Sequence, residues 1–100
     1  MKARFTPQAI VDIAAVYDVI ALVNPSAAQD VEDYIRKTAD DVAGFPGIGA
    51  PTNSRHVRRL PLVRYGYTLF YRIVIADDVV DILRIVPARK IRNLVRVPRA

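Results

Sequence analysis

Residues 65–90 read YGYTLFYRIVIADDVVDILRIVPARK, and this stretch decides the fold. Two runs rich in β-branched, aromatic and other apolar residues, 67–75 and 79–86, flank Ala76-Asp77-Asp78. Such runs around a short acidic turn are typical of a β-hairpin. Because side chains alternate along a strand, the first run predicts two faces. One face holds Tyr67, Leu69, Tyr71, Ile73 and Ile75, and the other holds Thr68, Phe70, Arg72 and Val74.

Two helix start signals precede the hairpin. Thr6-Pro7 and Asn24-Pro25 each place a good N-cap residue before a proline at the first helical position. Apolar residues recur at helical spacing after both signals, which predicts one helix over 7–23 and a second from 25 to about Gly44. Because almost no linker separates them, we expect an antiparallel helical hairpin.

The remaining strand signals complete the order. Residues 2–5 predict a short first strand, and residues 55–60 predict another that ends at Pro61. The resulting order is β-α-α-β-β-β, an α+β fold in which the helical hairpin packs on one face of a small, mostly antiparallel sheet. The length of 100 residues predicts one domain over 1–100.

Charge is divided along the chain. Residues 1–54 hold four cations and seven carboxylates, a net charge of −3, whereas residues 55–100 hold eleven cations and three carboxylates, a net charge of +8. Ten of these eleven cations are arginines, whose planar guanidinium suits phosphates and carboxylates. A basic face of this kind favours nucleic acid or an acidic protein segment as a partner. Charge that serves solubility alone is the simpler alternative.

Several classes of protein are disfavoured. There is no cysteine, so disulfides and thiolate metal sites are excluded. The longest apolar stretch, 13–23, is interrupted by Asp18 and is too short for a bilayer, and the N-terminus lacks a signal pattern. We therefore expect a cytoplasmic protein without a membrane partner. Neither metal-ligand spacing nor a phosphate-binding glycine loop is evident, so no metal and no cofactor are predicted.

The motifs in their order resemble the RelE/ParE superfamily of bacterial type II toxins, over roughly residues 3–92. They are Phe5-Thr6-Pro7, Asn24-Pro25-Ser26-Ala27-Ala28, Phe45-Pro46-Gly47-Ile48-Gly49, Gly66-Tyr67-Thr68-Leu69-Phe70-Tyr71-Arg72, and Ile82-Leu83-Arg84-Ile85-Val86 followed by Arg89-Lys90. The tight helical hairpin and the Asn-Pro-x-Ala-Ala opening look more like ParE than RelE.

This resemblance implies a toxin neutralised by a cognate antitoxin, in a toxin–antitoxin hetero-oligomer. Such antitoxins usually carry a DNA-binding part, so the complex is expected to reach DNA through the antitoxin. They also carry a segment that wraps the toxin. A cationic sheet face would attract an acidic, flexible segment of this kind.

The resemblance also separates two activities. RelE-like toxins cut messenger RNA on the ribosome, often with arginine at the position of Thr68, histidine at the position of Pro87 and tyrosine soon after Arg89. Here only Arg89 is retained. ParE-like toxins instead bind DNA gyrase and block replication without a catalytic set, and we favour this function. The alternatives are a ribosome-dependent mRNA endonuclease and a non-toxic basic module that binds RNA or protein, so enzyme activity stays open.

Six cations are the candidate residues for binding the target or the antitoxin on a basic sheet face: Arg58, Arg59, Arg72, Arg84, Arg89 and Lys90. Arg89 is the best single candidate because it matches the family motif. Arg72 and Arg84 stand on apolar strands, where an unpaired charge is costly. The structural alternative is that one of them pairs with Asp81. The single histidine, His56, is interpreted as a solvated strand residue rather than a general base.

Overall fold

The computed structural model describes residues 1–91, with side chains up to Arg89, and its elements follow the predicted order with short additions. The helices are α1 (Pro7–Ala21), α2 (Pro25–Gly44) and α3 (Ala88–Ile91), and the 3-10 turns are η1 (Pro46–Ile48), η2 (Val63–Tyr65) and η3 (Ile75–Asp77). The strands are β1 (Lys2–Phe5), β2 (Ala50–Pro51), β3 (Val57–Leu62), β4 (Tyr67–Val74) and β5 (Val79–Pro87).

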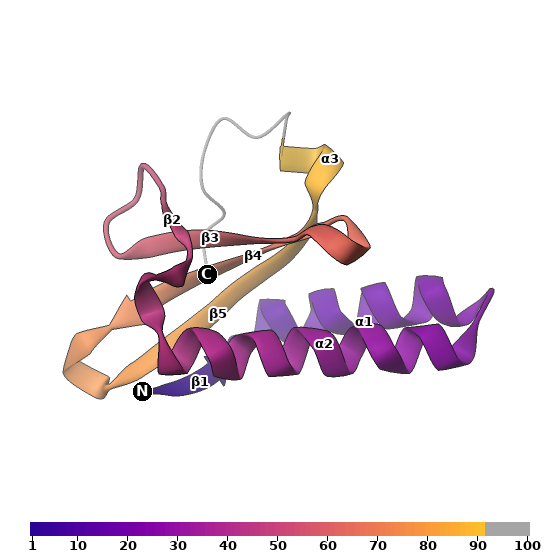
Figure 1. The fold of residues 1–100 in the computed structure, drawn as a ribbon, viewed down its shortest axis with the longest axis horizontal. Helices are drawn as coiled ribbons and strands as arrows, with labels where there is room; N and C mark the ends of the chain where they lie inside the picture. Colours follow the sequence, from indigo (N-terminus) through magenta and orange to yellow (C-terminus); the bar gives the residue numbers. More distant parts are fainter. Residues whose placement is uncertain (92–100) are drawn as a thin grey trace.

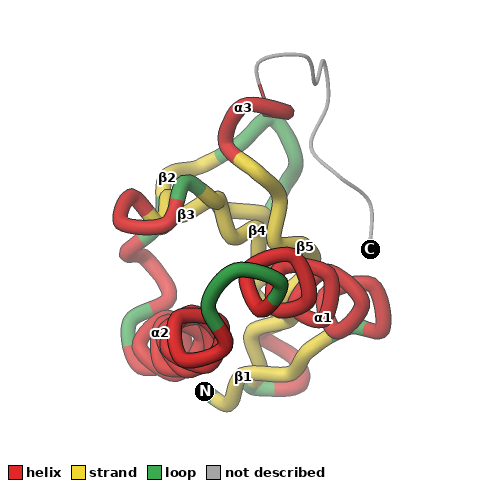
Figure 2. Tube along the Cα trace, turned by 90° about the vertical axis from the view of Figure 1, so that its right-hand side faces the viewer, coloured by secondary structure: helices red, strands yellow, loops and turns green. Residues whose placement is uncertain are grey.

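The five strands form one sheet in the order β1-β5-β4-β3-β2. Strand β1 runs parallel to β5, and every other pair is antiparallel. Helices α1 and α2 lie side by side on one face of this sheet (Figure 1), and they contact mainly β1 and β5. Figure 2 shows β2 and β3 on the far side of the sheet from β1. The predicted α+β fold is confirmed.

Both helices begin where the sequence predicts. The side chain of Thr6 accepts a hydrogen bond from the Ala9 amide (3.2 Å), and that of Asn24 accepts one from the Ala27 amide (3.1 Å). The sequence predicted that the first helix runs to Val23, but α1 ends at Ala21. Asn24 must be extended (φ −151°, ψ 96°) to cap α2, so the chain leaves α1 before reaching it.

The sheet carries apolar side chains on both faces. Leu69 and Tyr71 lie in the main core beneath the helices, whereas Phe70 lies in a second cluster with other buried residues of the opposite face, which we call the outer face. This confirms the predicted alternation of β4. A bulge occurs in β5, because Phe70 faces Arg84 while Tyr71 faces Ile82. Leu83 is therefore the extra residue, which lets both Ile82 and Ile85 join the main core.

One strand differs from its prediction. Strand β3 begins at Val57 and continues through Pro61 to Leu62, although Pro61 was expected to end it. Strand β2 pairs with β3 only at Arg58 and Arg59, so Pro61 lies where β3 is an edge strand. A proline is tolerated there because no ladder partner requires its missing N–H.

Candidate functional site

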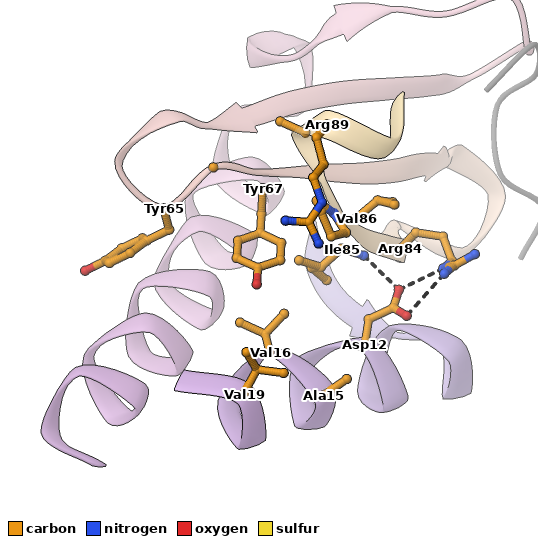
Figure 3. Close-up of a pocket in the computed structure, with 13 residues that line it drawn as sticks. Asp12, Ala15, Val16, Val19, Tyr65, Tyr67, Arg84, Ile85, Val86 and Arg89 are labelled. Carbon is orange, nitrogen blue, oxygen red and sulfur yellow. Dashed lines mark hydrogen bonds and ion pairs between the residues drawn. The ribbon is translucent and has the colours of Figure 1, made fainter. Parts of the chain in front are cut away.

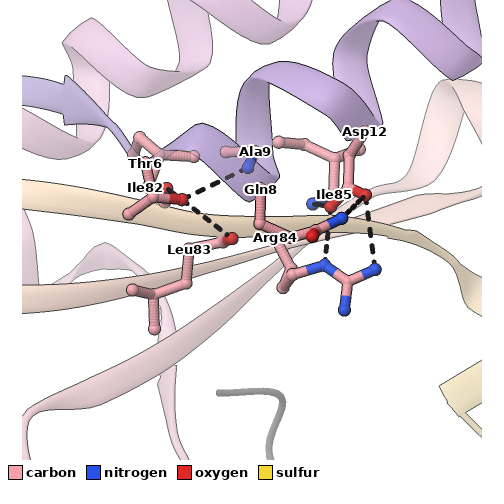
Figure 4. Close-up of polar contacts among 8 residues, drawn as sticks. All are labelled: Thr6, Gln8, Ala9, Asp12, Ile82, Leu83, Arg84 and Ile85. Carbon is pink, nitrogen blue, oxygen red and sulfur yellow. Dashed lines mark hydrogen bonds and ion pairs between the residues drawn. The ribbon is translucent and has the colours of Figure 1, made fainter. Parts of the chain in front are cut away.

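Asp12 of α1 attaches the helix to the edge of β5 (Figure 4). Strand β1 pairs with β5 only as far as Ile82, so the backbone of β5 beyond this point lacks a strand on that side. One carboxylate oxygen of Asp12 accepts hydrogen bonds from the Ile85 amide (2.9 Å) and from Arg84 Nε (2.7 Å). The other lies 3.3 Å from Arg84 Nη2 and 3.1 Å from Gln8 Nε2. The helix thus satisfies the part of β5 that β1 does not reach.

Arg84 is therefore a paired structural cation. The structural alternative, in which Arg72 or Arg84 pairs with Asp81, is wrong, because Asp12 binds Arg84 and Arg4 binds Asp81 (2.6 Å). The hydrogen bond and the charge of Asp81 raise the pKa of Arg4. The Asp12 side chain is only 10% exposed, so its negative charge requires this partner.

Arg58 also has a structural contact. It lies opposite Tyr71, and its Nη1 donates a hydrogen bond to the Gly49 carbonyl (2.6 Å). The buried hydroxyl of Tyr71 accepts from the Gly49 amide (2.9 Å) and donates to the Pro46 carbonyl (2.6 Å). Burial raises the pKa of Tyr71, although the Gly49 hydrogen bond and the charge of Arg58 oppose the shift. Together these groups hold the loop over 45–49 against the sheet.

Arg59 and Arg72 have a different environment. Arg59 lies opposite Phe70 and Arg72 lies opposite Val57, so both share the outer face of the sheet with these apolar residues. Both arginines are exposed. Neither forms an ion pair with a carboxylate within residues 1–91. These two guanidiniums are available to a partner.

Arg89 lies beside a groove between α1 and the ends of β4 and β5 (Figure 3). The groove has a volume of about 740 Å³. Its lining is mainly apolar and comes from Ala15, Val16, Val19, Tyr67, Ile85 and Val86. Arg89 reaches over this groove from α3, and the Asp12–Arg84 pair lies at its other side. The arrangement suits an apolar segment with an acidic group near Arg89.

The predicted basic sheet face is thus divided between several environments. Arg59 and Arg72 share the outer face, Arg58 holds a loop, Arg84 is neutralised by Asp12, and Arg89 is at the groove. The side chain of Lys90 lies outside the described residues. His56 is exposed in the turn before β3, with φ 63°, and not within a strand. The described part of the chain contains no group of three potential metal ligands and no helix able to cross a membrane.

Sequence reasoning missed the groove wall on α1. Ala15 and Val19 line the groove. Together with Val11, one turn earlier, they recur every four residues and are exposed, with Val11 59% and Val19 63% exposed. Residues spaced in this way share one side of a helix. The sequence signal that could have predicted the groove wall was this second apolar stripe on α1, which lies beside the stripe that enters the core.

Comparison with known proteins gives a consistent result. The family described as the ParE toxin of the type II toxin–antitoxin system, parDE, matches residues 3–92. The structure titled as a chromosomal ParDE system from P. aeruginosa has a TM-score of 0.74 and 27% identity, over 87% of this chain and 95% of that chain. Among curated proteins, no sequence matches.

Two RelE structures share the fold at lower identity. The isolated E. coli RelE toxin has a TM-score of 0.65 and 17% identity, over 87% of this chain and 83% of that chain. The intact E. coli RelBE complex has a TM-score of 0.64 and 15% identity, over 98% of both chains. The family match covers nearly the whole described chain, and the chain belongs to the ParE toxin family of type II toxin–antitoxin systems.

Proposed function

We propose that this toxin inhibits DNA gyrase, blocks replication, and is held inactive by an acidic cognate antitoxin. The family match to ParE carries the proposal. Binding to gyrase requires a surface and no reacting groups, and the chain offers such a surface. It is the groove beside Arg89, which has a mainly apolar lining.

The environment of Thr68 supports binding over mRNA cleavage. Thr68 occupies the position where mRNA-cutting toxins often have an arginine, and it is only 4% exposed. It lies opposite Pro61 on one side and Val86 on the other, so no cation is presented from this position. The one feature that favours the nuclease is Tyr67, which lines the same groove as Arg89. A phenol there is a group able to move a proton.

The groove also supports the antitoxin partner. Apolar side chains of α1 and β5 line it, and Arg89 supplies a positive charge at its side. Amphipathic segments bind grooves of this type through apolar anchors, and electrostatic complementarity then speeds association. Co-expression with the short reading frame adjacent to the toxin gene should restore growth and yield a co-purifying complex. An adjacent product that neither binds nor protects would exclude it as the antitoxin.

The gyrase proposal is tested with purified toxin, gyrase, ATP and relaxed plasmid. We expect loss of supercoiling and accumulation of linear DNA, and Arg89→Ala should reduce both by about tenfold if it removes one charged contact. Lys37→Ala is the matched control, because Lys37 is a surface cation on α2 that is paired with Asp41 (2.9 Å). Unimpaired supercoiling by gyrase in the presence of the wild-type toxin would refute the proposal. Ribosome-dependent cleavage of mRNA would establish the alternative.

A further inference from the structure

The part of the sheet formed by β2, β3 and β4 differs in charge from the rest of the described chain. Between Phe45 and Ala76 the sequence contains five arginines and no Asp or Glu. All the ion pairs among described residues lie elsewhere, on β1, β5, the turn before β5, α1 and α2. We call Arg55, Arg59 and Arg72 the basic strip, because all three are exposed on or beside β3 and β4. Arg58 is excluded since it binds Gly49.

The register of the strands places the cations of the strip close together. Arg59 faces Phe70 and Arg72 faces Val57, so the two arginines are diagonal neighbours on one face. Diagonal neighbours in an antiparallel pair are about 7–8 Å apart. Arg55 precedes β3 by two residues and therefore lies at the same end as Val57 and Arg72. Three positive side chains thus lie within the reach of a short run of phosphates.

The strip is poorly suited to a protein partner. Protein interfaces are anchored by large apolar side chains that enter pockets, within a polar rim. Here the apolar residues between the arginines are already buried, with Val57 2% and Phe70 3% exposed. The large exposed apolar side chains of the described chain lie instead on α1 and its link to α2, at the N-terminus, in the loop at 45–48 and in the 3-10 turns. Strand β4 is also paired on both sides, and β3 is covered by β2 at Arg58 and Arg59, so an added peptide strand has no edge beside the strip.

The strip is equally unsuited to unpaired bases. Single-stranded nucleic acid is held by aromatic rings on which the bases stack. The aromatic rings of β4 at this level are buried, with Tyr71 0% and Phe70 3% exposed. A duplex requires no such platform, because its phosphates carry about one charge per 1.7 Å of helix axis.

From this combination of exposed arginines without apolar or aromatic anchors, we propose that the basic strip binds the phosphate backbone of double-stranded DNA. This is a direct contact by the toxin, separate from any DNA contact made by an antitoxin, and it does not require gyrase. Phosphate contacts position a protein on DNA without reading its sequence. The expected binding is therefore weak, independent of sequence and strongly dependent on salt.

The test is fluorescence anisotropy with a labelled 20-base-pair DNA duplex and the full-length toxin alone. Three phosphate contacts predict that affinity falls by about 40-fold between 50 and 200 mM salt, and that Arg59→Gln or Arg72→Gln lowers this to about 12-fold. Arg36→Gln is the control, because it removes the same charge from a site outside the strip, on α2 beside Glu32. It should keep the wild-type salt dependence. Circular dichroism verifies that each variant is folded.

Three outcomes would overturn the proposal. The first is no duplex binding at 50 mM salt. The second is that Arg36→Gln loses as much salt dependence as the strip variants, which would show that binding depends on the net charge of the protein and not on the strip. The third is tighter binding of single-stranded DNA of the same length, or of polyglutamate, which would indicate stacking or an acidic protein partner. Gyrase inhibition in the plasmid assay is measured separately. A failure here is thereby distinguished from a failure of the proposed function.

Discussion

At the scale of single residues, arginines that look alike in the sequence have different tasks. Arg84 is bound by a carboxylate that is only 10% exposed, Arg58 is hydrogen-bonded to a carbonyl, and Arg59 and Arg72 are exposed. A guanidinium held by a buried carboxylate contributes to the fold, since removing one partner leaves the other charge unpaired. The exposed arginines make no such contribution and can be replaced without unfolding the chain.

Gly49 shows how closely the loop over 45–49 approaches the sheet. A Cβ atom at Gly49 would lie 2.7 Å from the Tyr71 hydroxyl and 2.8 Å from the Arg59 carbonyl, whereas a Cβ at Gly47 would meet nothing within 4 Å. Gly49→Ala should therefore destabilise the protein by about 2 kcal/mol through overpacking, while Gly47→Ala should stay within about 0.5 kcal/mol of the wild type. Urea denaturation measures both. Equal effects of the two substitutions would show that the loop is not held by Tyr71.

At the scale of elements, α1 and β5 depend on each other through Asp12. Asp12→Asn removes the negative charge that faces Arg84 and weakens the acceptor for the Ile85 amide. We expect a loss of about 3 kcal/mol in the free energy of unfolding, because the site is mostly buried. A double-mutant cycle with Arg84→Met isolates the pair, and its coupling energy should exceed that of Arg4→Met with Asp81→Asn. The Arg4 side chain is 53% exposed, so that pair is screened by water. A coupling near zero for Asp12 and Arg84 would contradict the role assigned to them.

The sequence predicted elements well where their signals are local. Thr6-Pro7 and Asn24-Pro25 marked both helix starts, and alternation in 67–75 separated the two faces of β4. The partner of Arg84 was not predictable, because Asp12 lies 72 residues away and sits in an apolar run of α1. The bulge at Leu83 was missed for a related reason, since it depends on the register between β4 and β5. The groove beside Arg89 likewise forms only when α1 meets the end of the sheet.

At the scale of the whole molecule, two surfaces of different chemistry are kept apart. The groove between α1 and β5 is apolar with cations at its sides, and the basic strip of β3 and β4 is cationic without exposed apolar anchors. The first has the composition of a protein-binding groove, and the second has that of a polyanion-binding surface. The proposed contacts with a protein and with a duplex would not compete, because the groove is walled by α1 on one face of the sheet, whereas Arg59 and Arg72 lie on the opposite face.

Repulsion within the basic strip should also reduce stability, because Asp81, the carboxylate opposite Arg72 on β5, is bound by Arg4. The chain carries a net charge of +5, and the cations of the strip repel one another without ion pairs among the described residues. The double variant Arg59→Gln with Arg72→Gln should therefore be more stable than the wild type by about 0.5–1 kcal/mol at low salt. Because salt screens such repulsion, the difference should shrink as sodium chloride is raised to about 0.5 M. Lys37→Gln, which removes a cation paired with Asp41, should instead leave stability unchanged or lower it. Urea denaturation at the two salt concentrations measures all three proteins, and a double variant less stable than the wild type at low salt would show that these arginines serve the fold.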